Sequence, residues 1–436
     1  MASTTYLQWQ NITAGNRNTW TMSMWVKTSV NNDEQPLFSS ALDSNNQDMV
    51  FIEAGGNLRW WTYQSSSYAG QLRTSRLLRD ANAWYHLVFV FDSTNSTADD
   101  RMRIYINGVQ ETSFTARVNP SQNTNSLWNG TLWRNIGHDS SGVYTDEFDG
   151  SMSHIHFIDG TAYDASYFGE TDANGVWKIN TSPSVTYGTN GFFILKDGNS
   201  VTDQSGNGNN FTVAGGTLTD TLDCPSNVFA TINPLQWNGN ITNASLSNGN
   251  TTYTSSATGT DYSWFYSTLG ATSGKWYAEF KCVDSGGAMI GIGGNDFATS
   301  SYFTANAINS DGIGYYYNGS VFIKDVSQGS LTAISNNDIV GVAMDLDNSL
   351  VYWYLNGSVQ NSGTGMSIPT SNTGFYHFVV ADASSTPTPT IQANFGNGYF
   401  GTTAVASAGT NASGIGIFEY DVPTGYTALS TKGLNL

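Results

Sequence analysis

The stretch WYHLVFVFDSTNSTADDRMRIYINGVQ (84–110) decides the fold class. It opens with a nearly continuous apolar run, as expected for a strand in the centre of a sandwich. A polar turn and a second strand follow, and Asn107-Gly108 then signals a hairpin turn. The stretch IVGVAMDLDNSLVYWYLNGSVQ (339–360) repeats this order and carries Asn356-Gly357. The repeated strand–turn–strand pattern predicts similar architecture in two domains.

The composition of the chain also favours short strands joined by turns. Of 436 residues only 11% are charged and 13% are aromatic, whereas about 25% charged is ordinary for a globular protein. Asn, Ser, Thr and Gly punctuate turns, and aromatic and β-branched residues fill strands. No convincing helix exceeds a turn or two. We therefore predict an all-β protein made of two tandem antiparallel jelly-roll β-sandwiches.

The net charge and the N-terminal sequence limit which partners and which location we expect for this protein. The net charge of −18 would repel phosphate backbones and anionic lipid, so nucleic acid is not an expected partner. The first 20 residues contain no basic stretch followed by an apolar run, so they are not a Sec signal peptide. No segment approaches 18 uninterrupted apolar residues, and membrane insertion is not expected. The composition resembles that of a secreted β-protein although no export signal is present, and synthesis in a host cytoplasm with release by lysis, as for a virus particle, would resolve this conflict.

The two cysteines are Cys224 and Cys282. In KWYAEFKCVD (275–284), Cys282 shares a strand face with Trp276, Ala278 and Phe280. This setting favours a buried reduced thiol over a disulfide.

The order of several motifs resembles two known families. WTMSMWVKT (20–28), NAWYHLVFVFD (82–92), RIYINGVQ (103–110) and FDGSMSHIHFIDGTAYDASYFG (148–169) resemble the laminin-G-like, concanavalin A-like lectin sandwich. SGKWYAEFKC (273–282), the stretch 337–357 and IQANFGNGYFG (391–401) resemble a SPRY domain. The expected domains are a lectin-like sandwich over 1–204, a linker over 205–239, a SPRY-like sandwich over 240–400 and a tail over 401–436.

The pairing of these domains resembles fibre and virion-surface proteins of tailed, particularly marine, phages. The connecting text FGETDANGVWK (168–178) and LDCPSNVFATINPL (222–235) is also similar to that group. The resemblance implies a non-enzymatic tail or head fibre, or adhesin, whose lectin-like module binds host-surface glycans. One alternative is a capsid- or tail-decorating subunit that binds only other virion proteins. Another is a glycan-degrading enzyme.

The best candidate for glycan binding is NLRWWTYQSSSYAG (57–70). If Leu58 and Trp60 face the core, then Arg59, Trp61 and Tyr63 line the outer face of the strand. Flat aromatic rings beside an arginine can stack on sugars while the guanidinium contacts hydroxyls or carboxylates. Trp128 and Trp133 are candidates for the rim of the same site. The alternative is that these aromatic residues cover a subunit contact or pack under loops.

In the SPRY-like half, Tyr315 and Tyr317 share one strand face and Tyr316 lies on the other. We expect Tyr315 and Tyr317 to bind a neighbouring virion protein. Because stacking one sugar contributes on the order of 1 kcal/mol, useful attachment needs several copies of the site. A homo-oligomer is therefore expected, with a trimer favoured by analogy with phage fibres.

His154 and His156 invite the hypothesis of a metal site. The laminin-G-like pattern puts Ile155 and Phe157 in the core and both histidines on the opposite, wetter face. Zinc needs three or four converging donors, so surface or interface histidines are the favoured interpretation and no metal site is assigned. Calcium has suitable oxygens at 43–48, 92–100 and 144–150, although ordinary turns explain these stretches equally well.

Catalytic constellations are sought and not found. Retaining glycosidases need two carboxylates about 5 Å apart, and the nearest match, Glu147-Phe148-Asp149, is followed by Met152 where the second carboxylate would stand. No Gly-x-Ser-x-Gly elbow precedes a helix, and no phosphate-binding glycine loop with lysine is present. We assign no catalytic residue and no cofactor.

Overall fold

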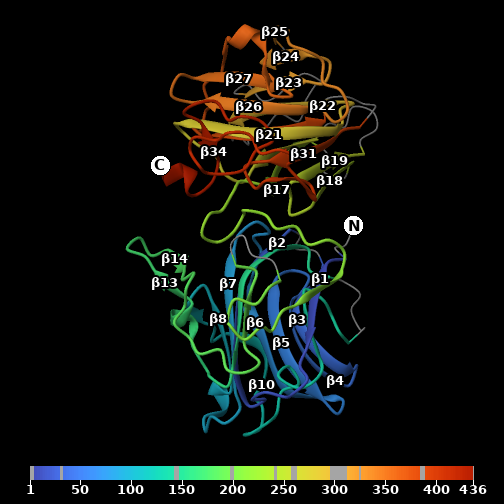
Figure 1. The fold of residues 1–436 in the computed structure, drawn as a ribbon, viewed down its shortest axis with the longest axis vertical. Helices are drawn as coiled ribbons and strands as arrows, with labels where there is room; N and C mark the ends of the chain where they lie inside the picture. Colours follow the sequence, from blue (N-terminus) through green and yellow to red (C-terminus); the bar gives the residue numbers. More distant parts are fainter. Residues whose placement is uncertain are drawn as a thin grey trace. The chain divides into compact units, whose positions relative to one another are not determined.

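The computed structural model describes residues 4–29, 33–141, 147–196, 201–239, 243–256, 263–294, 312–323, 326–382 and 388–435. It divides into two compact units, Met1–Asp220 with Cys224–Ser226, and Thr221–Asp223 with Asn227–Leu436. Both units consist of antiparallel sheets, as predicted (Figure 1). Helical structure in the described ranges is limited to short 3-10 turns: η1 (Ala98–Asp100), η2 (Ala165–Tyr167), η4 (Asn361–Gly363) and η5 (Gly433–Asn435). No helix there has the length and apolar character to cross a membrane.

The first unit contains two large sheets and one small hairpin. The eight-stranded sheet has the order β10 (Phe114–Val118), β6 (Ser67–Leu77), β5 (Asn57–Gln64), β4 (Asn46–Ile52), β3 (Gln35–Asp43), β11 (Trp133–Ile136), β1 (Tyr6–Gln10), β16 (Thr212–Gly215). The six-stranded sheet has the order β15 (Phe192–Ile194), β12 (Gly150–Asp159), β2 (Thr19–Thr28), β7 (Tyr85–Asp92), β8 (Met102–Ile106), β9 (Val109–Gln110). The hairpin is formed by β13 (Gly169–Thr171) and β14 (Trp177–Ile179).

The core of the first unit is aromatic. Trp20, Trp60 and Phe89 are at most 1% exposed and belong to one buried cluster. The ring of Trp20 lies 5.5 Å from that of Trp60, and Phe89 packs edge-on against Trp60 at 5.7 Å. Because Trp60 comes from one sheet and Trp20 and Phe89 from the other, the inner faces of the two sheets meet here.

The second unit repeats the sandwich. Its seven-stranded sheet has the order β17 (Ile232–Gly239), β20 (Ser263–Ser267), β30 (Tyr376–Asp382), β22 (Ala288–Gly294), β23 (Gly312–Tyr316), β24 (Ser320–Ile323), β25 (Val326–Ser330). The other sheet has the order β18 (Ala244–Ser247), β19 (Thr252–Ser255), β31 (Thr390–Asn394), β21 (Lys275–Asp284), β26 (Ile339–Asp345), β27 (Leu350–Leu355), β28 (Ser358–Val359). Off this path are β29 (Met366–Ser367), which pairs with β27, and β34 (Thr427–Ala428), which pairs with β21. A small hairpin joins β32 (Tyr399–Phe400) and β33 (Thr403–Ala404).

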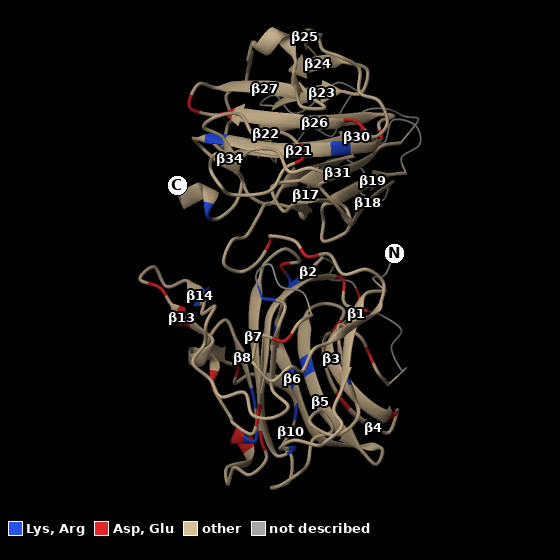
Figure 2. Cartoon of the chain, viewed as in Figure 1, with Lys and Arg blue, Asp and Glu red and all other residues tan. Residues whose placement is uncertain are grey.

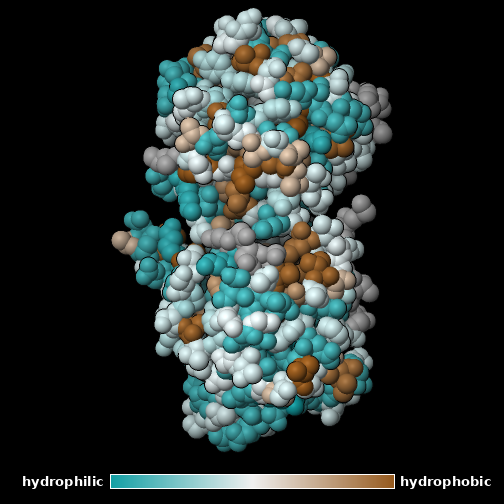
Figure 3. Space-filling model, viewed as in Figure 1, coloured by the Kyte–Doolittle hydropathy of each residue, from teal (hydrophilic) through white to brown (hydrophobic). Residues whose placement is uncertain are grey.

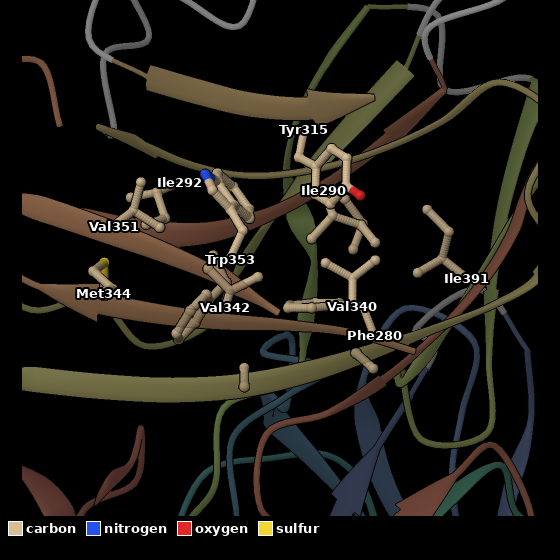
Figure 4. Packing of buried hydrophobic residues seen from close by; sticks show 14 of the residues in the cluster. Phe280, Ile290, Ile292, Tyr315, Val340, Val342, Met344, Val351, Trp353 and Ile391 are labelled. Atoms are coloured by element: carbon tan, nitrogen blue, oxygen red, sulfur yellow. The ribbon is translucent and has the colours of Figure 1, made fainter. Parts of the chain in front are cut away.

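The second core is formed by the facing sides of these two sheets. Figure 4 shows Ile290 and Tyr315 from one sheet pointing toward Val340, Trp353 and Ile391 from the other. Cys282 belongs to the same buried cluster, together with Trp276, Ala278 and Phe280. The expectation of a buried reduced thiol is confirmed, because Cys224 and Cys282 are both buried and not joined in a disulfide, and burial raises the pKa of the Cys282 thiol to about 12.

The repeated hairpin is confirmed at atomic detail. Asn107 and Gly108 have φ of 49° and 81°, and Asn356 and Gly357 have 48° and 77°, as a type I′ turn requires. In each hairpin the asparagine side chain accepts from the backbone N–H that opens the preceding long strand. Asn107 accepts from His86 at 2.8 Å, and Asn356 accepts from Ile339 at 2.9 Å.

The predicted boundaries of the linker and the tail are wrong. Within the expected linker 205–239, β16 pairs with β1 in the first unit, and β17 pairs with β20 in the second. The expected tail 401–436 belongs to the second unit, because Phe418 and Tyr426 are buried beside Tyr277 and β34 pairs with β21. The apolar residues of both stretches are too widely spaced to show a strand pattern, although several are buried in the cores, among them Phe211 in the first unit and Ile232 in the second.

Candidate functional site: the outer face of the eight-stranded sheet

Strand β5 alternates as the sequence predicted. Leu58 and Trp60 are buried in the core of the first unit, and Arg59, Trp61 and Tyr63 therefore lie on the outer face of the eight-stranded sheet. The bulge that would have broken this alternation occurs in the partner strand β6, between the residues opposite Thr62 and Tyr63.

Trp61 is not the exposed stacking ring that we expected. It is only 4% exposed and packs edge-on against Phe51 at 4.9 Å. The Arg59 guanidinium lies 4.7 Å above the Trp61 ring, and the Tyr68 ring lies 6.2 Å away from it. Trp61 thus forms the floor of the outer face and is covered by its neighbours, which alternation along one strand cannot reveal.

Residues that can meet a ligand lie across the strands. Strand pairing places Ala41 opposite Gln47, Gln47 opposite Tyr63, and Tyr63 opposite Tyr68. Because Asn135 pairs with Ser39, Trp133 falls on the continuation of this line, two residues further along β11. We call Trp133, Ala41, Gln47, Tyr63 and Tyr68 the outer-face row.

The two ends of the outer-face row carry its exposed aromatic rings. Trp133 is 47% exposed and Tyr68 is 39% exposed, and Tyr63 is half-buried with its ring 5.0 Å from that of Tyr68. Between these ends, Ala41 is partly buried and Gln47 is buried. Figure 3 shows hydrophobic groups of different sizes scattered over the face that is drawn.

Two buried polar atoms of the outer face have no hydrogen-bond partner among the described residues. They are Oε1 of Gln47 and Nε1 of Trp61, whereas Nε2 of Gln47 donates to the carbonyl of Ser44 at 3.0 Å. Leaving a buried polar group unpaired costs about 1–3 kcal/mol. Oε1 of Gln47 is an acceptor and Nε1 of Trp61 is a donor. A hydroxyl group can donate a hydrogen bond to the first atom or accept one from the second.

The charges beside the row satisfy one another. Glu53 accepts from Arg59 at 3.2 Å and from Arg73 at 2.5 Å. Arg59 also donates to the Tyr68 hydroxyl at 2.8 Å, and to the Gln71 carbonyl once that amide is turned toward the guanidinium. Charged residues are sparse along the strands generally (Figure 2). The guanidinium groups therefore hold the outer face together.

Trp128 is misassigned, because it is fully buried in the core and does not reach the rim. Its ring packs against Phe38 at 4.8 Å and Phe157 at 6.1 Å. The backbone N–H of Trp128 donates to the buried carboxylate of Asp48. Burial raises the pKa of Asp48 to about 6, against the opposing effect of its hydrogen bonds.

Tyr315 is also misassigned as a partner-binding residue. Tyr315 and Tyr317 do share a face opposite Tyr316, but that face is the core of the second unit. Tyr315 is fully buried, packs against Trp353 at 5.6 Å and donates its hydroxyl to the carbonyl of Thr332. Tyr317 is partly buried against the same cluster. Both faces of β23 are covered, so alternation could not separate them.

The histidine pair lies on the non-core side of β12, as predicted, but this side is not wet. Ile155 and Phe157 are in the core, whereas His154 and His156 are 1% and 2% exposed. His156 stacks on Phe193 at 3.9 Å, and its Nδ1 hydrogen-bonds to the hydroxyl of Tyr187 at 2.8 Å. The segment that follows β12 covers both rings. The expectation of surface or interface histidines is wrong.

A serine–histidine pair on the six-stranded sheet requires a chemical test. Oγ of Ser23 lies 2.9 Å from Nε2 of His86, and the indole N–H of Trp177 donates to Nδ1 of His86 at 3.0 Å. Since Nδ1 accepts, a neutral His86 carries its proton on Nε2, and burial lowers its pKa to about 3. A general base must accept the proton of the serine at this nitrogen. The pair is therefore structural.

No group of three or more His, Cys, Asp or Glu suited to a metal ion occurs in the ranges that the structure describes. The calcium candidates at 43–48 and 92–100 fall within these ranges, and Asp43 and Asp92 there bind turn residues. Of the third candidate, 144–150, residues 144–146 lie outside the described residues.

Sequence reasoning missed Tyr68, Gln47 and Ala41, which complete the outer-face row. A usable signal was present in Ser65-Ser66 between two strand-like runs, because a two-residue hairpin fixes the register of β5 against β6. Both serines have positive φ, 51° and 64°.

Comparisons with known proteins agree with this geometry. Residues 2–165 match the family model of the concanavalin A-like lectin/glucanases superfamily. The first unit has a concanavalin A-like fold. No curated protein matches the chain. Similar solved structures include the SPRY domain of human HERC1, with 15% identity over 37% of this chain and 96% of that one and a TM-score of 0.31.

Two further structural neighbours of the chain have similar scores. A heptameric SAP-like pentraxin from Limulus polyphemus shares 16% identity over 37% of this chain and 72% of its own, with a TM-score of 0.27. A human SPRY domain shares 12% identity over 36% of this chain and 95% of its own, also at 0.27. Concanavalin A-like and SPRY-like β-sandwiches are compatible with carbohydrate or protein binding.

Proposed function

We propose that this chain is a non-enzymatic surface protein of a tailed-phage virion, a tail or head fibre, whose concanavalin A-like unit binds host-surface glycans. The observation that carries the glycan-binding part is the outer-face row, which presents Tyr63 and Tyr68 at one end and Trp133 at the other. Exposed aromatic rings beside a polar floor suit the alternating apolar faces and hydroxyl edges of sugars. The virion location rests on the sequence resemblance of the connecting segments.

The binding is expected to be weak at a single site. An aromatic contact contributes roughly 0.5–1.5 kcal/mol beyond its buried area, and the row offers only two aromatic ends. A homo-oligomer, with a trimer favoured, would present several copies and raise the avidity. The neutral, fixed tautomer of His86 supports the non-enzymatic part of the proposal.

The first experiment is affinity electrophoresis of the full chain in gels that contain neutral or acidic polysaccharides. We expect retardation by at least one neutral polysaccharide and its reduction in Tyr68→Ala. The matched control is Phe375→Ala, because Phe375 is 49% exposed but lies in the second unit. No retardation in any gel would contradict glycan binding, and release of reducing sugar during incubation would favour the enzyme.

The location is tested by labelling intact particles with antibodies raised against the chain. Label at a fibre tip supports the adhesin. Label seated uniformly on the shell, with no glycan retardation, supports the decorating subunit that binds only other virion proteins.

A further inference from the structure

The outer-face row is longer than one sugar ring. From β5 to β11 the strand order passes through β4 and β3, which is three strand spacings, or about 14 Å. Tyr63 and Trp133 therefore cannot stack on the same ring. A single ligand that touches both ends must be a chain of several rings that crosses the strands.

The middle of the row leaves room for such a chain. Ala41 projects only a methyl group, and Gln47 is 7% exposed and folded back so that its Nε2 donates to Ser44. Beyond Trp133, the paired residue Gln10 is exposed and donates to the carbonyl of Thr131. The row thus has exposed aromatic rings at its two ends. The side chains between them, Ala41 and Gln47, are short or buried.

The charges of the face do not suit an acidic ligand. Arg73 donates to Glu53 and also to Thr115 at 2.8 Å and Asn57 at 2.9 Å, and Arg59 is held by Glu53, Tyr68 and Gln71. Glu53 therefore offsets part of the positive charge of both guanidinium groups, and most of their N–H donors are already engaged. The net charge of −18 on the whole chain repels polyanions as well.

The unpaired atoms of the floor call for hydroxyl groups. Oε1 of Gln47 needs a donor and Nε1 of Trp61 needs an acceptor, and a hydroxyl supplies both functions. Gln47 and Trp61 occupy neighbouring positions on β4 and β5, since Gln47 pairs with Tyr63 and Met49 pairs with Trp61.

We infer that the ligand of the outer-face row is an extended, uncharged polysaccharide that crosses the strands from Tyr63 and Tyr68 to Trp133. This inference rests on the proposed function and adds the charge and minimum length of the glycan. It follows from the spacing of the aromatic ends, the mutual pairing of the charged groups and the two unpaired floor atoms.

The test is a length series of neutral oligosaccharides cut from a polysaccharide that retards the full chain, measured by titration calorimetry. Wild-type affinity should rise with length and then level off once both ends are engaged. Trp133→Ala should weaken binding of the longest members roughly three- to tenfold and leave the shortest unchanged. Tyr68→Ala should weaken both, and Phe375→Ala neither.

The outcomes separate this inference from the proposed function. If Trp133→Ala changes the binding of neither the short nor the long oligosaccharides, the ligand does not extend to Trp133. That result would overturn the extended chain and leave glycan binding intact. Tighter binding of a carboxylated or sulfated chain of equal length would overturn the uncharged class. No binding of any saccharide would overturn the proposed function itself. Circular dichroism of each variant checks that the protein is folded. We expect Trp133→Ala to fold, because Trp133 lies at the surface.

Discussion

The indole of Trp177 fixes the position and the proton of His86 through the 3.0 Å hydrogen bond from Nε1 to Nδ1. The two rings stack at 5.8 Å, and Trp25 stacks on the other side of His86 at 4.8 Å. This contact anchors the hairpin β13–β14 on the outer side of the six-stranded sheet. A cap far along the chain thereby buries a histidine that the local sequence would leave exposed.

We expect Trp177→Phe to lower the free energy of unfolding of the first unit by about 1–3 kcal/mol, because Nδ1 of His86 loses its donor in a buried site. Chemical denaturation monitored on the full chain measures this change. Val176→Ala is the matched control, since Val176 is 49% exposed on the same hairpin. Equal effects of the two substitutions would show that the hydrogen bond does not hold the hairpin.

The first unit should lose stability in acid. Burial lowers the pKa of His86 to about 3 and that of His156 well below 6.5. A histidine whose folded pKa is lowered stabilises the fold above pH 6.5, and this contribution is lost as the pH falls toward the folded pKa. Between pH 7 and pH 5 the contribution of His86 should fall by about 2 kcal/mol, and that of His156 should fall in the same direction. In His86→Gln the pH dependence of unfolding should be shallower; an unchanged slope would contradict the assignment.

The titration of Glu279 should change the stability of the second unit with pH in the opposite direction. It is fully buried and accepts from the backbone N–H groups of Glu419 and Tyr420 at 2.8 and 2.9 Å. Burial raises its pKa to about 7, with the hydrogen bonds opposing the rise. A raised carboxyl pKa means that the folded state holds the proton, so stability falls as the pH rises from 4.5 to 7.

We therefore expect the stability of wild type relative to Glu279→Gln to fall by up to about 3 kcal/mol between pH 4.5 and 7. Denaturant unfolding at several pH values measures the difference, and the subtraction cancels the contribution of His377, whose pKa burial lowers. A difference that is constant with pH would show that Glu279 does not titrate in this range.

Arg134 is a buried cation whose pKa burial lowers to about 9. It donates to the carbonyl of Trp128 and to Oδ1 of Asn129, and it lies 4.8 Å from the ring of Trp9. Arg134→Met should destabilise the first unit by about 2–5 kcal/mol, because buried acceptors lose their donor. Lys178→Met is the control and should cost at most about 1 kcal/mol, because Lys178 is 58% exposed and its partner Asp172 is also accessible to solvent. A smaller loss at Arg134 than at Lys178 would contradict this role.

Local pattern predicted the strands, the Asn-Gly hairpins and the core-facing sides of β5 and β12, but not the core-facing side of β23. It could not predict what covers the other side. Trp61 and His156 lie on the predicted non-core faces of their strands, whereas Tyr315 lies on a core face. All three are buried by side chains or segments from elsewhere in the chain. The outer-face row escaped prediction for the same reason, because its members come from five strands and only their register brings them together.

A crystal structure of the full chain with a neutral oligosaccharide bound tests the central claim most directly. Sugar rings stacked on Tyr68 and on Trp133, with the intervening rings over Ala41 and Gln47, are the predicted result. Saccharide bound only at the loops of either unit, with the outer-face row empty, would contradict it.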